Sequence, residues 1–85
     1  MNFSVIDEAI GIENICNLYK TDYGDTILEI KAKNISTGKL VYMDFMKVVG
    51  NKIFWHPNAL QVVDPKFSPF ARLKIKKIIK NRAFL

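Results

Sequence analysis

The chain has 85 residues, a length that suits one domain spanning 1–85 and leaves no room for two hydrophobic cores. Apolar residues make up 49% of it and aromatic residues 12%, which is enough for a packed core and excludes a disordered chain. The net charge is +5, yet residues 1–65 carry six Lys/Arg against eight Asp/Glu, whereas residues 66–85 carry seven Lys/Arg and no acid. This asymmetry indicates a docking surface for an anionic partner at one end of the chain.

Features of the N-terminal half bear on where the protein works. Asp7 and Glu8 stand where a secretory signal would be cationic, and no run approaches the ~18 apolar residues of a membrane-spanning helix. Cys16 is the only cysteine, so no disulfide can form within the chain. We therefore expect a cytoplasmic protein in which Cys16 is a buried core residue.

The first predicted element is a helix over residues 4–20. Ser4 can cap it, and Asp7 in the first turn suits the helix dipole. One apolar stripe follows at helical spacing: Val5, Ala9, Ile12, Cys16 and Tyr19. Gly11 inside this run costs about 1 kcal/mol relative to alanine, which favours a later start or a break there.

Three or four antiparallel strands are predicted to follow. Residues 26–33 alternate apolar and charged side chains, the pattern of a half-buried strand, and a glycine-containing turn leads to the next strand. Residues 40–49 are rich in β-branched and aromatic side chains on both faces, which predicts a central strand covered on both sides. Residues 52–56 form the returning strand, and residues 59–63 add a short fourth.

The last predicted element is a basic amphipathic helix. Ser68 can cap it, and Pro69 at the first helical position needs no hydrogen-bond partner for a backbone donor. One arc of the helix is apolar: Ala71, Ile75, Ile78 and Ile79. The opposite arc is cationic: Arg72, Lys76, Lys77 and Lys80.

These elements predict an α+β domain with the order helix, antiparallel meander, helix. A strongly bent meander closing into a small SH3-like or OB-like barrel with terminal helices is the alternative.

Few residues are suited to catalysis. His56 is the only histidine and has no adjacent nucleophile, and Asp7 and Glu8 are the only neighbouring carboxylates. The segment 36–39, STGK, ends like a phosphate-binding loop but lacks the earlier glycine and precedes a strand, so we interpret it as a hairpin turn. We predict a protein that is not an enzyme and needs neither a metal nor a cofactor.

Nucleic acid is the partner that the basic tail favours, because Lys and Arg neutralise phosphates. Aromatic residues in the strands, such as Phe54 and Trp55, could stack on unpaired bases, which favours RNA or another single strand over duplex DNA. The candidate nucleic-acid-binding residues are Lys52, Trp55, His56, Lys66, Arg72, Lys74, Lys76, Lys77, Lys80 and Arg82.

A protein partner is the alternative. The chain would then be a small accessory protein or inhibitor, of the general type that phages use in counter-defence or that act as antitoxins. It would dock on an acidic or RNA-bearing surface of a nucleic-acid-processing enzyme, with RNA able to bridge the two. An anionic membrane surface is disfavoured, because the apolar arc of the last helix is narrow and matches what the sheet needs as cover. The pattern carries no information on oligomeric state.

Overall fold

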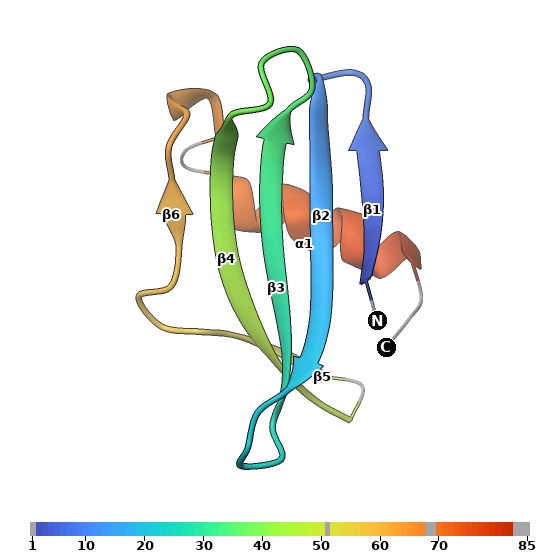
Figure 1. Cartoon of the computed structure of the whole chain (residues 1–85), viewed down its shortest axis with the longest axis vertical. Helices are drawn as coiled ribbons and strands as arrows, with labels where there is room; N and C mark the ends of the chain where they lie inside the picture. The colour runs from blue at the N-terminus through green and yellow to red at the C-terminus, as the bar shows by residue number, and fades with distance from the viewer. Residues whose placement is uncertain (1, 51, 68–69, 83–85) are drawn as a thin grey trace.

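The computed structural model describes residues 2–50, 52–67 and 70–82, without the side chains of Asn2, Asn81 and Arg82. Its strands form one antiparallel sheet, and one α-helix crosses behind that sheet (Figure 1). The described elements are β1 (Asn2–Asp7), β2 (Ile12–Lys20), β3 (Thr26–Asn34), β4 (Leu40–Val49), β5 (Lys52–Trp55), β6 (Gln61–Val62), the short 3₁₀ helix η1 (Pro65–Phe67) and α1 (Ala71–Arg82).

The predicted helix over residues 4–20 is wrong, because this segment forms β1, a turn and β2. Asp7 does not support a helical first turn; its Oδ1 accepts a hydrogen bond from the backbone N–H of Ala9 at 3.1 Å and tightens the turn. Gly11 ends that turn at a φ of 68°, a left-handed conformation that glycine adopts without strain. In the described residues the predicted order helix, meander, helix is therefore replaced by a sheet followed by one α-helix.

The strand prediction for the middle of the chain is confirmed, and its edges are refined. β3 and β4 pair as a hairpin whose connection uses Gly38 at a φ of 71°. The edge of β4 that does not pair with β3 is shared by two strands. β5 pairs with the second half of β4, and the short β6 pairs with residues 42–43 of β4. Within the described residues β1 pairs only with β2, so the sheet is open and the barrel alternative is also wrong.

The C-terminal helix is confirmed from Ala71 onward, whereas its predicted cap, Ser68 and Pro69, lies outside the described residues. Ala71, Ile75 and Ile79 are buried and pack with the hydrophobic cluster of the sheet. Cys16 is also buried in this cluster, as predicted. The sheet residues buried in the same cluster are Ile12, Cys16, Leu28, Ile30, Ala32, Val41, Tyr42 and Met46.

The two faces of the sheet have different surroundings. Cross-strand pairing places Cys16, Ile30 and Asp44 on the face toward α1. The opposite face, called here the open face, is covered by no described element, which corrects the prediction that residues 40–49 are covered on both sides. Figure 1 is viewed onto this open face, with α1 behind the strands.

Candidate nucleic-acid interface

The outer side of α1 presents three lysines to solvent. Lys76, Lys77 and Lys80 are all exposed, while the isoleucines of the same helix face the sheet. Within the described part of the chain none of the three forms an ion pair, and the ion pairs that exist involve Lys31, Lys47 and Arg72. Their ammonium groups are therefore available to an anion.

Arg72, on the same helix, is already paired with a buried carboxylate. Its Nε donates to Oδ2 of Asp44 at 2.7 Å and its Nη2 donates to Oδ1 at 3.2 Å, a bidentate arrangement. Nη2 also donates to the backbone carbonyl of His56 at 3.0 Å. The side chain of Asp44 has no exposed surface, so this pair holds α1 on the sheet, and Asp44 offsets the charge of Arg72.

The carboxylate of Asp44 is satisfied on its other sides as well. The hydroxyl of Tyr42 donates to Oδ2 at 2.9 Å, and the backbone N–H of Phe45 donates to Oδ1 at 2.8 Å. Burial, with the hydrogen bond to Asp44, raises the pKa of the Tyr42 phenol well above its usual range. The hydrogen bonds to Asp44 likewise raise the pKa of Arg72. A buried charge is tolerated here because it is both paired and hydrogen-bonded.

Trp55 lies against the helix rather than in solvent. It is half-buried, and the guanidinium carbon of Arg72 lies 5.2 Å from its ring centre, within cation–π range. With Ile53 and Met46, Trp55 lines a small hollow of about 90 Å³ whose rim includes Lys76. The structure thus brings Trp55, Arg72 and Lys76 together.

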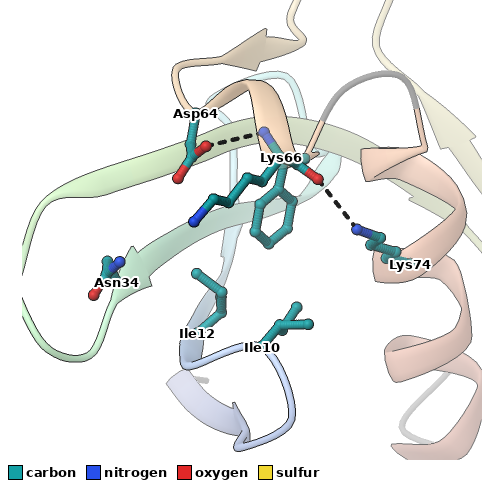
Figure 2. Close-up of a pocket in the computed structure, with 7 residues that line it drawn as sticks. Ile10, Ile12, Asn34, Asp64, Lys66 and Lys74 are labelled. Carbon is teal, nitrogen blue, oxygen red and sulfur yellow. Dashed lines mark hydrogen bonds between the residues drawn. The ribbon is translucent and has the colours of Figure 1, made fainter.

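Lys66 and Lys74 meet at a second hollow, between η1, the start of α1 and the turn before β2 (Figure 2). It has a volume of about 260 Å³. Nζ of Lys74 donates to the backbone carbonyl of Lys66 at 3.4 Å and lies 5.1 Å from the ring centre of Phe67. The Lys66 side chain extends over the hollow on the side of Asn34, and Asp64 occupies the same rim. This hollow has mixed charge.

The remaining candidates lie elsewhere. Lys52 pairs with Val49 and therefore shares the open face with Phe54, and His56 lies there too, lining a hollow with Tyr19. The Arg82 side chain falls outside the described residues. The ten predicted residues therefore do not form one surface: six occupy the helix layer or its rim, with Trp55 beneath them, and two lie on the open face.

Two features of this region were not predicted from the sequence. Phe70 and Leu73 are 61% and 54% exposed, although the outer side of the helix was expected to be only cationic. The ion pair between Arg72 and Asp44 was also not predicted. Asp44 is the single carboxylate within a largely apolar strand, and a carboxylate buried in such a strand needs a cation as its partner. Of the strand aromatics, Tyr42 is buried, Phe45 is half-buried and Phe54 is 52% exposed.

Among the described residues, no three His, Cys, Asp or Glu side chains are grouped closely enough to hold a metal ion. In the same part of the chain, no helix has the length and apolar character needed to traverse a lipid bilayer. Comparison with models of protein families, with curated proteins and with solved structures finds no match for this chain. The functional assignment therefore depends on the surfaces described above.

Proposed function

We propose that this protein is a small, non-catalytic nucleic-acid-binding protein that contacts phosphates through α1. The observation that carries the proposal is the group of three exposed lysines, Lys76, Lys77 and Lys80, none of them ion-paired within the described residues. A solvated helix usually mixes charges of both signs for support between neighbouring turns, and α1 contains no acid. A polyanion would supply the missing counter-charge.

The lysines are presented by a helix whose position is fixed. Ile75 and Ile79 anchor α1 in the core, and Arg72 is bound to the buried Asp44, so the ammonium groups project from a rigid base. Lysine contacts a phosphate as a point charge without reading base identity. The proposed binding is therefore independent of nucleotide sequence and falls as salt rises.

We favour RNA or another single strand over duplex DNA as the ligand, because unpaired bases can stack on aromatic rings. Phe54 and Tyr19 are aromatic side chains about half exposed on the open face, and they support this choice. Cys16 is the only cysteine of the sequence and is buried, which supports a reducing, cytoplasmic location for the activity.

Substitution of two helix lysines tests the proposal. Lys77→Gln/Lys80→Gln removes two exposed charges from α1, and Lys33→Gln/Lys39→Gln removes two exposed charges from the β3–β4 region as a matched control. Binding of a fluorescent single strand is measured by anisotropy over a range of salt concentrations. The slope of log affinity against log salt is negative. Its magnitude should fall by about 1.4 for the helix variant, at ~0.7 per lost phosphate contact.

The control variant should retain the slope of the unmodified protein. Binding that does not respond to salt, or equal losses in both variants, would show that α1 is not the phosphate-binding surface.

A protein partner is the second candidate, and the exposed Phe70 and Leu73 favour it specifically. Apolar side chains on the outer side of a helix, next to lysines, are typical of surfaces that dock on an acidic protein. Capture of partners from lysate with and without nuclease separates the two functions. A protein retained after nuclease treatment and lost on Leu73→Ser would assign α1 to protein docking; loss of all partners on nuclease treatment supports the nucleic-acid function.

A further inference from the structure

The open face contains a hollow of about 270 Å³ at the end where β2 finishes and β3 begins. It is lined by Tyr19, Thr21, Ile27, Phe45, His56 and Ala59. We propose that this hollow receives an unpaired base of a bound single strand; the inference rests on the proposed nucleic-acid-binding function and extends it to a base-binding site.

Strand pairing explains how the lining residues meet. Tyr19 on β2 pairs with Ile27 on β3, and Ile27 pairs in turn with Lys47 on β4 and through it with Phe54 on β5. Two residues from Lys47 along β4, the backbone N–H of His56 donates to the carbonyl of Phe45 at 3.0 Å, which continues the ladder beyond β5. The hollow thus has an aliphatic floor, Ile27, and aromatic rings at its sides.

Size and chemistry suit a single planar ring. The hollow is smaller than the ~300–1,000 Å³ of sites for drug-sized ligands, so it has room for one ring system. Tyr19 is 45% exposed and can stack on the face of a base, while the imidazole of His56 and the Tyr19 hydroxyl can hydrogen-bond its edge.

A cation lies beside the hollow and matches the charge of a phosphate backbone. Lys47 is paired across the strand with the floor residue Ile27. Nζ of Lys47 lies 3.3 Å from Oδ1 of Asp25, but both side chains are more than two-fifths exposed. Such a surface pair is weak, so a phosphate can replace Asp25.

A second copy of the chain is a poorer occupant of this face. The side chains of Lys31 and Glu29 form an ion pair 3.6 Å apart on β3, the middle strand of the meander. Charged residues are depleted at the centre of protein interfaces, and burying this pair against another copy would require its desolvation.

β5 connects the base-binding hollow with the helix surface. Its side chains alternate, so that Trp55 faces α1, where it shares a hollow with Lys76, while Phe54 faces the other way and His56 lines the open-face hollow. A single strand that passes over the β5 edge can therefore place phosphates near Lys76 and a base beside Tyr19. This route brings the two separate groups of candidate residues onto one ligand.

The test compares two probes of equal length and charge. One is an oligothymidylate of about 12 nucleotides, within the ~4–16 nucleotide sites of single-strand-binding folds, and the other has abasic sites throughout. The intact probe should bind about tenfold to a hundredfold more tightly than the abasic probe, as expected for stacking of a base. Tyr19→Ala should abolish most of this difference.

Tyr23→Ala is the matched control, because Tyr23 is a 94% exposed tyrosine that does not line the hollow. It should leave the preference for the intact probe unchanged. Amide shifts of the unmodified protein provide a second measurement: Tyr19, Phe45 and His56 should respond to the intact probe and not to the abasic one.

The outcomes separate this inference from the proposed function. Equal, salt-dependent binding of both probes would overturn the base-binding site and leave the proposed function standing. No binding of either probe would overturn both. Self-association on gel filtration that Phe54→Ser abolishes would assign the open face to a second copy and overturn the inference.

Discussion

The face of the sheet that α1 covers and the open face hold similar residues in different surroundings. On the covered face, Asp44 is fully buried, and its oxygens accept hydrogen bonds from Tyr42 and Arg72. On the open face, Glu29 and Lys31 form a longer pair whose lysine is 41% exposed. A charge buried under the helix is already paired within the protein and stabilises the fold, whereas a charge on an exposed surface is available to a ligand. Position in the layers therefore decides which of the basic residues can bind.

The largest effect expected from this difference concerns the carboxylates. Asp44→Asn should lower the free energy of unfolding by about 3 kcal/mol, the lower end of the ~3–5 kcal/mol range for a broken buried pair, because Arg72 is one-third exposed. Asp25→Asn, which breaks the surface pair with Lys47, should change it by less than ~1 kcal/mol. Urea denaturation of both variants measures the contrast, and equal losses would contradict it.

Isoleucine truncation gives a second contrast between the faces. Ile75→Ala should lower the free energy of unfolding by about 2–4 kcal/mol, because Ile75 is 1% exposed and its removal leaves a cavity beneath α1. Ile6→Ala, on the open side of β1, removes the same atoms from a side chain that is 56% exposed and should have little effect. Thermal unfolding of the pair tests this. A large loss for Ile6→Ala would mean that something covers the open face in solution.

Alkaline pH provides a smaller and more specific contrast. The folded protein keeps the Tyr42 phenol protonated above its ordinary pKa of 10, where the unfolded chain ionises it. The stabilisation is therefore complete below about pH 10 and is lost as the pH rises further, by at most about 1.4 kcal/mol per pH unit. Tyr42→Phe lacks this titration. The difference in the free energy of unfolding between the unmodified protein and the variant should therefore narrow above pH 10.

Denaturation series at several pH values measure that gap for Tyr42→Phe. Tyr23→Phe, at the exposed tip of the β2–β3 turn, removes a hydroxyl from a side chain that is 94% exposed and serves as the control. A constant gap for Tyr42→Phe would show that the phenol ionises equally in the folded and unfolded states.

The C-terminal helix could be predicted from sequence, and the N-terminal strands could not, for a physical reason. In α1 residues 71–76 alternate apolar and basic side chains as a strand would, but the adjacent Lys76 and Lys77 break the alternation and the apolar residues continue at helical spacing to Ile79. In β2 the buried set Ile12, Asn14 and Cys16 contains a polar member, so alternation is hidden and the spacing of four residues imitates a helix.

The candidate site was only partly readable for a related reason. The sequence shows the cations directly. It does not show which of them is already ion-paired, because Asp44 pairs with Arg72, 28 positions away. The hollow near Tyr19 was missed because Tyr19 was assigned to a helix. The hollow depends on the strand register and the Asp44–Arg72 pair on how α1 packs across the sheet, and local sequence spacing shows neither.

The bidentate pair between Arg72 and Asp44 also restricts how α1 can roll about its own axis. Apolar packing alone is non-directional and permits small rotations, whereas a fork that donates to both oxygens of one carboxylate defines a single angular setting. Lys76 and Lys80 follow Arg72 by one and two turns on the same side of the cylinder, so their azimuth is set by that contact. A buried aspartate thus sets the direction in which two exposed lysines project from the molecule.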